Sequence, residues 1–232
     1  MPNIGLFRSC LRSAALVALL GASSAVAAAQ SPQDALADKF TPFAVNIDRA
    51  QKQSWPGYGI YLGEGLVITA SHVVGHASAG DPSVHIAGKL LKAKFVKEGA
   101  FQTVDLTLLR IDPASLPASL GLRRMPLCEA PPQPGQPVIT VTPQATVPSR
   151  IMAPQLLPPA VREKFDTVIS DVETTGNSGS GVFDPARQCL MGIMSRKIQV
   201  PAGRNGDASA AMIDLAKYFV PATQIRAFIK LN

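Results

Sequence analysis

The stretch TTGNSGSGVF, residues 174–183, carries the most structural information in this sequence. It places Ser178 between two glycines and ahead of an apolar segment. Glycine permits backbone conformations and close approaches that residues with a Cβ resist, so such a turn presents a serine hydroxyl at a sharp bend. The same turn can aim backbone N–H groups at a developing oxyanion. Taken alone, the pattern is equally typical of an ordinary surface turn.

Two segments upstream favour a catalytic role for this turn. Residues 69–74, TASHVV, contain His72, and residues 104–109, VDLTLL, contain Asp105. Histidine, aspartate and serine in this chain order supply a base, a group that orients the base, and a nucleophile. Ser178 is a poor nucleophile until a base takes its proton, so His72 must lie within hydrogen-bond reach in the folded protein.

Other residues of the same types compete for these roles. The competing histidines, aspartates and serine are His76, His85, Asp81, Asp112 and Ser180. The two histidines do not follow a strand and turn in the same frame, and both aspartates precede a proline, as turn residues often do. Chain order also argues against an esterase of the α/β-hydrolase type, in which the serine precedes the acid and the histidine.

The N-terminal segment is predicted to be a secretory signal peptide. Arg8 and Arg12 give it a positive start, residues 13–29 carry no charge, and its end is rich in small residues that suit cleavage. The segment is too short and too rich in Ala, Gly and Ser to favour a spanning helix, although an uncleaved anchor is the alternative. We therefore expect residues 1–29 to be removed from an exported, periplasmic or secreted protein without stable membrane insertion.

Length and charge limit what the mature chain can be. Subtracting 29 residues from 232 leaves 203, enough for one sizeable domain or two small packed lobes. Loss of Arg8 and Arg12 lowers the formal charge from +6 to +4, which is weak evidence for any partner. Four lysines cluster between residues 89 and 97 with a single aromatic residue, Phe95, among them, so a solvated strand face is favoured over a stacking surface and no nucleic-acid partner is expected.

Two cysteines would remain after cleavage, Cys128 and Cys189. An even pair in an exported protein suits a disulfide, but whether the two meet depends on geometry that the sequence does not give. Neither cysteine lies in a glycine-rich turn, so neither is a candidate nucleophile. The sequence has no C-x-x-C or H-E-x-x-H spacing, and we expect no metal and no cofactor.

Short apolar runs between turn signals predict a mainly β protein. Residues 57–70 are predicted to form a hairpin with its turn at 63–65. Further strands are predicted at residues 84–86, 90–96, 106–111, 138–141, 168–170, 181–183 and 189–195. Two proline-rich segments, 112–137 and 143–159, are predicted to be a linker and a loop. Residues 221–230 are the best helix, with Thr223 as its N-cap.

Four stretches together resemble one protein family. They are the glycine hairpin that ends in ITASHVV (68–74), DLTLLR (105–110), GNSGS (176–180) and FVPA (219–222). With these motifs the chain resembles the trypsin-like serine proteases of chymotrypsin fold, especially the bacterial glutamyl-endopeptidase and high-temperature-requirement branches. The resemblance spans about residues 57–229. Each stretch alone is unspecific, whereas all four in this order are specific.

The resemblance implies an all-β fold of two packed six-stranded antiparallel β-barrels with a short C-terminal helix. The first lobe, residues 30–125, would carry His72 and Asp105. The linker and second lobe, residues 126–232, would carry Ser178 and the helix, and the active site would lie in the cleft between the barrels.

The resemblance also assigns roles to residues. Its frame of glycine, acid or amide, serine and glycine selects Ser178 over Ser180. His72 would be the general base and acid, and Asp105 would orient it. The backbone of Gly176, Asn177 and Ser178 would form the oxyanion hole. Because Asn177 replaces an aspartate that pairs with a newly cut N-terminus in zymogen-activated relatives, activation by such a cleavage is not expected.

The substrate-binding residues implied by the resemblance are Thr174, Thr175, Ser195, Arg196 and Lys197. Arg196 and Lys197 stand where relatives often have an aromatic residue and a glycine. The two cations could attract acidic substrate groups or narrow the specificity pocket, or they could face solvent. Asp171 or Glu173 could instead receive a basic side chain, so the sequence leaves specificity open.

Two functions therefore follow from the sequence. The first is an exported serine endopeptidase that cleaves protein or peptide substrates, acts as a monomer and lacks an appended peptide-binding domain. The alternative is a catalytically silent protease-fold module with a binding or chaperone-like role. The complete set of His72, Asp105 and Ser178 favours the enzyme, and the unusual Arg196 and Lys197 keep the alternative open.

Overall fold

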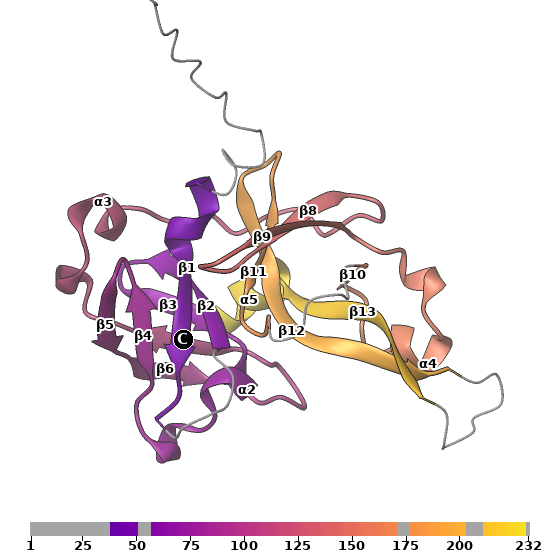
Figure 1. Ribbon diagram of the computed structural model, residues 1–232, viewed down its shortest axis with the longest axis horizontal. Coiled ribbons are helices and arrows are strands. Elements are labelled where there is room, and N and C mark those ends of the chain that lie inside the picture. The colour runs from indigo at the N-terminus through magenta and orange to yellow at the C-terminus, as the bar shows by residue number, and fades with distance from the viewer. Residues whose placement is uncertain (1–37, 51–56, 171–176, 203–210, 231–232) are drawn as a thin grey trace, which may run out of the picture. The chain divides into compact units, whose positions relative to one another are not determined.

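The computed structural model describes residues 38–50, 57–170, 177–202 and 211–230. The predicted signal peptide lies outside these residues, as do Thr174, Thr175 and Gly176. The described chain is mostly β-structure in two antiparallel sheets with short helices between strands (Figure 1). The expected all-β, chymotrypsin-like fold with a short C-terminal helix is confirmed.

The first sheet has seven strands in the order β5-β4-β1-β2-β3-β7-β6. These are β1 (Ala44–Asp48), β2 (Gly57–Gly63), β3 (Leu66–Thr69), β4 (Ser83–Ile86), β5 (Lys89–Lys92), β6 (Lys94–Glu98) and β7 (Thr107–Arg110). The sheet has one strand more than the resemblance implies, because the strand predicted at 90–96 is two. It breaks at the buried Ala93, whose backbone N–H donates to the Pro82 carbonyl at 3.0 Å.

The predicted hairpin at residues 57–70 is confirmed as β2 and β3. Glu64 and Gly65, between the paired ends of the strands, have φ angles of 55° and 77°. Positive φ at both central residues is what a tight type I′ hairpin requires, and glycine adopts it without strain. The hairpin delivers the chain directly into α2 (Ser71–Val74), which carries His72.

The second sheet has six strands in the order β10-β13-β12-β11-β8-β9. They are β8 (Pro137–Val141), β9 (Thr146–Arg150), β10 (Val168–Ile169), β11 (Gly181–Asp184), β12 (Cys189–Pro201) and β13 (Met212–Pro221). Strand β9 falls in the segment predicted to be a proline-rich loop. Its Pro148 is tolerated because β9 is an edge strand, where a missing N–H need not break a ladder.

The helices are short. Besides α2 they are η1 (Thr41–Phe43), η2 (Ala77–Ala79), η3 (Pro113–Ser115), α3 (Ala118–Gly121), η4 (Pro154–Leu156), α4 (Pro159–Arg162) and α5 (Ala222–Ile229). The predicted C-terminal helix is confirmed as α5, but Pro221 occupies the N-cap position, so Thr223 lies inside the first turn. Within the described part of the chain, no helix is long and apolar enough to cross a membrane.

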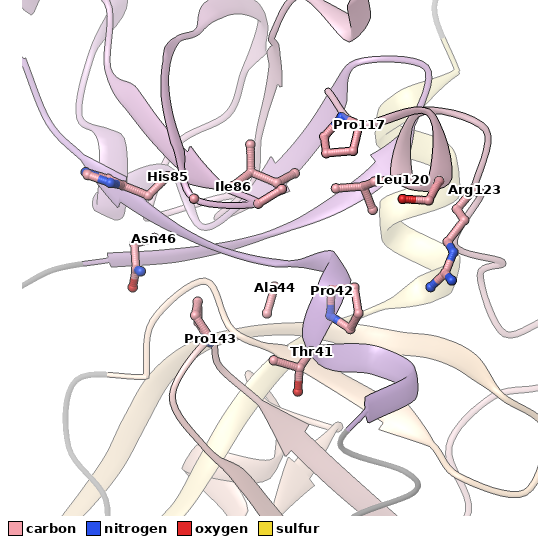
Figure 2. A pocket seen from close by; sticks show the side chains of 13 residues that line it. Thr41, Pro42, Ala44, Asn46, His85, Ile86, Pro117, Leu120, Arg123 and Pro143 are labelled. Atoms are coloured by element: carbon pink, nitrogen blue, oxygen red, sulfur yellow. The ribbon is translucent and has the colours of Figure 1, made fainter. Parts of the chain in front are cut away.

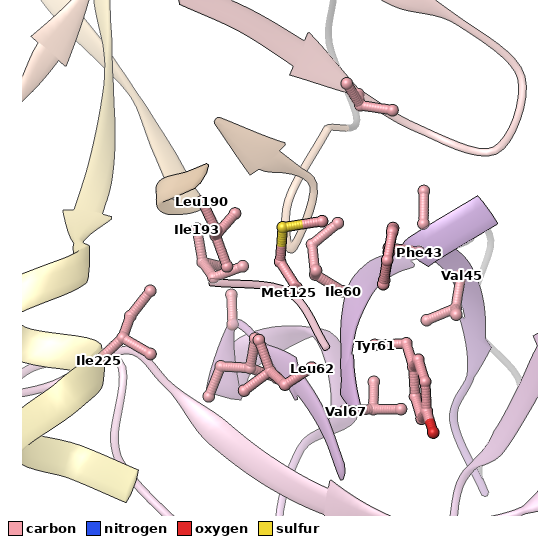
Figure 3. Packing of buried hydrophobic residues seen from close by; sticks show 14 of the residues in the cluster. Phe43, Val45, Ile60, Tyr61, Leu62, Val67, Met125, Leu190, Ile193 and Ile225 are labelled. Atoms are coloured by element: carbon pink, nitrogen blue, oxygen red, sulfur yellow. The ribbon is translucent and has the colours of Figure 1, made fainter. Parts of the chain in front are cut away.

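A buried apolar cluster joins the two sheets. Ile60 and Leu62 of β2 lie in the same cluster as Leu190 and Ile193 of β12 and Ile225 of α5 (Figure 3). Each fully buried side chain of this kind contributes about 1.5–3 kcal/mol. The cluster therefore holds β2 and β12, the strands that flank the candidate site, in a fixed relation.

Cys128 and Cys189 are bonded to each other in a disulfide. Cys128 lies in the segment between the sheets, and Cys189 begins β12. Both are buried in a second apolar cluster that also contains Val182 and Phe219. The disulfide therefore ties the connecting segment to the strand that leads to Ser195.

Candidate active site

The sheet register brings His72 and Asp105 together. Thr69 at the end of β3 pairs with Thr107 of β7, so α2 starts beside the residues that precede β7. His72 Nδ1 lies 2.8 Å from Asp105 Oδ2, and the His72 backbone N–H donates to Asp105 Oδ1 at 3.2 Å. The carboxylate of Asp105 thus holds His72 through both its ring and its backbone N–H.

Asp105 is buried but well supplied with donors. Ser71 Oγ donates to Oδ1 and Ser195 Oγ donates to Oδ2, each at 2.6 Å. Burial, the largest single influence, raises the pKa of Asp105, but the hydrogen bonds from His72, Ser195 and Ser71 outweigh it and lower the pKa to about 2. Asp105 is therefore ionised at neutral pH. An ionised acceptor at Nδ1 favours the tautomer of His72 whose Nε2 can accept a proton.

The turn that carries Ser178 is held between the two sheets. The Tyr58 N–H of β2 donates to the Ser178 carbonyl at 3.0 Å, and the Gly179 N–H donates to the Met194 carbonyl of β12 at 2.8 Å. Gly179 has a φ of 85°, and a Cβ at this position would lie 1.9 Å from the Tyr58 carbonyl oxygen. The close approach of β2 therefore requires glycine here.

The two serines of the turn differ in their surroundings. Ser180 is fully buried, and its Oγ donates to the Asn177 carbonyl at 2.6 Å. Ser178 is partly exposed, and its Oγ donates to the Ser195 carbonyl at 3.3 Å. Among the described residues, no hydrogen bond joins Ser178 Oγ to His72. Such hydrogen bonds are often long before substrate binds.

Ser195 links Asp105, the hydrogen-bond partner of His72, to Ser178. Its side chain donates to Asp105, while its carbonyl accepts from Ser178. The pairing of β12 with β13 shifts register between Met194 and Arg196, which makes Ser195 the extra residue of a β-bulge. Bulges re-aim side chains and are over-represented next to active sites. This bulge places Ser195 between the residues predicted to be catalytic.

The two predicted cations on β12 point to different partners. The Arg196 guanidinium lies 3.7 Å above the Phe101 ring and 3.8 Å from Asp105 Oδ2. Lys197 Nζ donates to Asp214 Oδ2 on β13 at 2.7 Å, and this hydrogen bond lowers the pKa of Asp214. Lys217, in register with Lys197, is 3% exposed. Each cation on β12 is therefore matched by a carboxylate, Arg196 by Asp105 and Lys197 by Asp214.

Part of the predicted site lies outside the described residues. This part comprises Thr174, Thr175 and Gly176, of which Gly176 was assigned to the oxyanion hole. Asn177 and Ser178, the other two residues assigned to the hole, lie in the described turn that enters β11. The geometry of an oxyanion hole therefore stays a prediction.

Sequence reasoning missed three residues that contact this constellation. They are Ser71, which donates to Asp105; Tyr58, which donates to Ser178; and Phe101, whose ring packs edge-on against His72 at 5.2 Å. Ser71 adjoins His72 in the sequence, and that adjacency was the one available signal. Tyr58 reaches the site because β2 packs against the turn of the other sheet, and Phe101 reaches it from the segment between β6 and β7.

Two cavities differ in their relation to the site. One of about 240 Å³ is lined by Ser71, His72, Phe101 and neighbouring residues. A larger cavity of about 530 Å³ is lined by β1, the β4–β5 turn and the α3 region, with Asn46 and Arg123 toward its ends (Figure 2). The larger cavity contains none of the predicted catalytic residues. Across the described ranges, no cluster of three or more metal-ligating side chains occurs.

Two packed antiparallel sheets, with a histidine–aspartate pair from one and a serine turn on the other, define the chymotrypsin-like fold of serine peptidases. The model of the trypsin-like peptidase domain family matches residues 57–193. This match covers more than half of the sequence, and the chain belongs to that family. The family match and the described fold thus agree on a trypsin-like peptidase domain.

Solved structures agree on the fold. The serine endoprotease from Yersinia pestis has a TM-score of 0.59 at 18% identity, and the alignment covers 86% of this chain and 65% of that one. The Rv3671c protease of M. tuberculosis, in an inactive form, has a TM-score of 0.54 at 18% identity, with 84% and 90% coverage. The chain thus spans less than two thirds of the Yersinia enzyme. Functionally curated proteins give no significant match.

Proposed function

We propose that this protein is an exported serine endopeptidase that hydrolyses peptide bonds through an acyl-enzyme on Ser178. The observation that carries the proposal is the placement of Ser195. Its side chain donates to Asp105, which holds His72, and its carbonyl accepts from Ser178 Oγ. Ser195 thereby keeps the His72–Asp105 pair and the turn that carries Ser178 within a single hydrogen-bonded unit.

The chemistry follows from these positions. Ser178 Oγ leaves the Ser195 carbonyl, transfers its proton to His72 Nε2 and attacks the substrate carbonyl carbon. The imidazolium that forms is stabilised by Asp105, and His72 then gives the proton to the leaving amine. Water then attacks the acyl carbon while His72 takes its proton, and His72 gives this proton to Ser178 Oγ as the ester bond breaks and the acid is released. Backbone N–H groups of residues 176–178 would bind the oxyanion, and each such donor is worth about 2.7–4 kcal/mol in characterised hydrolases.

The choice of Ser178 as nucleophile is supported by exposure. Ser180 is fully buried and its hydroxyl is committed to the Asn177 carbonyl. Ser178 is partly exposed and its hydroxyl has only a weak, 3.3 Å contact to give up. A nucleophile must reach substrate, which the Ser178 hydroxyl can do and the Ser180 hydroxyl cannot do without unfolding the turn.

The finer assignments are part of the same proposal. The four sequence stretches support an assignment to the glutamyl-endopeptidase and high-temperature-requirement branches, and in this proposal the protein acts as a monomer after removal of residues 1–29. Residues 174–175 and 195–197 line the substrate site.

A fluorophosphonate probe tests the proposal directly. Protein recovered from the exported fraction should carry the probe on Ser178, located by mass spectrometry, and its N-terminus should follow residue 29. Ser178→Ala and His72→Ala should remain folded and unlabelled, while Ser180→Ala, which alters the neighbouring hydroxyl, should still be labelled. If the folded protein never reacts with the probe, the proposal of a serine endopeptidase is refuted.

The hydrogen bond from Ser178 Oγ to the Ser195 carbonyl favours a second candidate, a catalytically silent module with a binding or chaperone-like role. In that case the hydroxyl is held away from His72 permanently. Capture of unfolded polypeptide by wild type and Ser178→Ala alike, without probe labelling of wild type, would support this candidate over the enzyme.

A further inference from the structure

Arg196 makes an unusual set of contacts for a strand residue. Its Nε–H donates to Ser195 Oγ at 3.2 Å, and its Nη2 donates to the Phe101 carbonyl at 2.6 Å. Nη2 also lies 3.8 Å from Asp105 Oδ2. The guanidinium therefore reaches from β12 of the second sheet to residues 101–105 of the first.

The β-bulge explains how Arg196 and Ser195 act together. Successive side chains of a regular strand point to opposite faces. The register shift between Met194 and Arg196 interrupts this alternation, and both Ser195 and Arg196 reach Asp105 Oδ2. The bulge thus delivers two neighbouring polar groups to one carboxylate oxygen.

The hydrogen bond from Arg196 to Ser195 sets the direction of the serine hydroxyl. Because Ser195 Oγ accepts from Arg196 Nε, its own proton is free to point at Asp105, to which it donates at 2.6 Å. Without the guanidinium, the Ser195 hydroxyl could rotate to another acceptor. Asp105 would then lose one of its three side-chain donors and part of the constraint on His72.

The second contact of Arg196 is with the aromatic wall of the site. The guanidinium stacks 3.7 Å above the Phe101 ring, and that ring packs edge-on against His72 at 5.2 Å. The ring centre of Phe165, which precedes β10 in the chain, lies 5.6 Å from the guanidinium carbon. A planar guanidinium can stack on a ring while its N–H groups, fixed in a fork-like arrangement, donate hydrogen bonds in set directions. A lysine ammonium has neither the plane nor this fork of donors.

We propose that Arg196 is a positioning residue of the active site, which rests on the proposed function. Arg196 orients the Ser195 hydroxyl toward Asp105 and presses Phe101 against His72, so that the imidazole is held for proton transfer with Ser178. It contacts none of the reacting atoms. Its effect is on the rate of the chemical step and is transmitted through Ser195 and Phe101.

Steady-state kinetics separates positioning from substrate binding. Arg196→Met keeps most of the side-chain volume but removes the guanidinium, and Arg196→Lys keeps the charge but removes the fork. We expect both to lower kcat about 10- to 100-fold, the range that one hydrogen bond to a charged group represents, with KM changed less than about threefold. Arg124→Met is the matched control, because Arg124 is hydrogen-bonded to Glu64 in the first sheet, and its kcat should equal that of wild type.

The result that would overturn the proposal is a kcat of Arg196→Met within about twofold of wild type, or a loss found in KM alone. Rescue of kcat by Arg196→Lys to the wild-type value would also overturn it, because charge alone would then suffice. Thermal unfolding of each variant distinguishes a lower kcat from loss of folded protein.

A measurement without turnover separates this proposal from the proposed function. Proton NMR of the His72 Nδ1–H, hydrogen-bonded to Asp105, gives a low-field signal in folded protein with or without activity. We expect a sharp signal in wild type and Arg124→Met, and a shifted or exchange-broadened signal in Arg196→Met. An unchanged signal in Arg196→Met refutes the positioning role, even if Ser178 proves to be the nucleophile. A changed signal in a protein that takes no probe refutes only the proposal that the protein is an enzyme.

Discussion

Replacing Gly179 by alanine tests whether the nucleophile turn is held in place by β2 of the other sheet. The added Cβ would lie 1.9 Å from the Tyr58 carbonyl oxygen and 2.6 Å from Thr69 Oγ1. The first contact is with backbone, so a change of side-chain rotamer cannot relieve it. Either the turn or β2 must move, and the hydrogen bond from the Tyr58 N–H to the Ser178 carbonyl is the first to be lost.

The magnitude follows from three contributions. A residue with a Cβ at the left-handed φ of 85° costs about 1–2 kcal/mol. Displacing β2 breaks the hydrogen bond from Tyr58 to Ser178 and the one from Thr69 Oγ1 to the Tyr58 carbonyl, about 1 kcal/mol each. Gly179→Ala should therefore lower the free energy of unfolding by about 3–4 kcal/mol and abolish labelling of Ser178.

Urea denaturation followed by circular dichroism measures this change. Gly88→Ala is the matched control, since Gly88 also has a positive φ, 74°, but has open space around its missing Cβ. Its free energy of unfolding should fall by only about 1–2 kcal/mol, the cost of backbone strain, and Ser178 should still be fully labelled. Equal losses in the two variants would refute the reasoning, because the clash with β2 would then contribute nothing.

Three further predictions concern the disulfide, the buried acid and the second serine of the turn. Removing the bridge between Cys128 and Cys189 by a double change to alanine should lower the free energy of unfolding by about 4 kcal/mol, measured in urea, because the bond closes a loop with a sequence separation of 61. The pKa of Asp105 is lowered from 3.8 to about 2, so its ionised form stabilises the folded protein above about pH 4 and loses this contribution, about 2 kcal/mol, as the pH falls toward 2. Asp105→Asn should therefore show a stability that falls less between pH 5 and pH 2 than that of wild type, and parallel pH profiles would contradict this. Ser180→Ala should lose about 1–2 kcal/mol of stability in the same urea assay yet react with the probe at the wild-type rate, and loss of labelling in folded protein would count against Ser178 as the nucleophile.

Local signals predicted much of the fold. The hairpin at 57–70 was readable because glycine supplies the positive φ that its turn requires, and the apolar run at 106–111 was readable because β7 is buried. Strand β13 was not predicted as a strand. Its Asp214 and Lys217 interrupt the apolar pattern of the sequence, and Asp214 is accommodated because it accepts hydrogen bonds from Lys197 and Gln199 of the neighbouring β12.

The candidate site was predicted less completely than the fold. Residue type and chain order singled out His72, Asp105 and Ser178, and the sheet register brings His72 to Asp105. The contacts that surround them depend on packing between the two sheets. Ser195 was assigned to substrate binding, but its side chain lies on Asp105 because a β-bulge redirects it, and a bulge leaves no mark in the sequence.

The hydrogen bond between Ser195 and Asp105 has a consequence for the order of folding. It joins residues 90 positions apart, and the nucleophile turn likewise depends on Tyr58 of β2. Closing such long loops costs conformational entropy before any contact compensates for it, and topologies built from distant pairings fold slowly. The contacts that link His72, Asp105 and Ser178 are therefore completed late, after both sheets have docked. A newly made chain whose sheets have not yet docked would lack the arrangement on which the proposed activity depends.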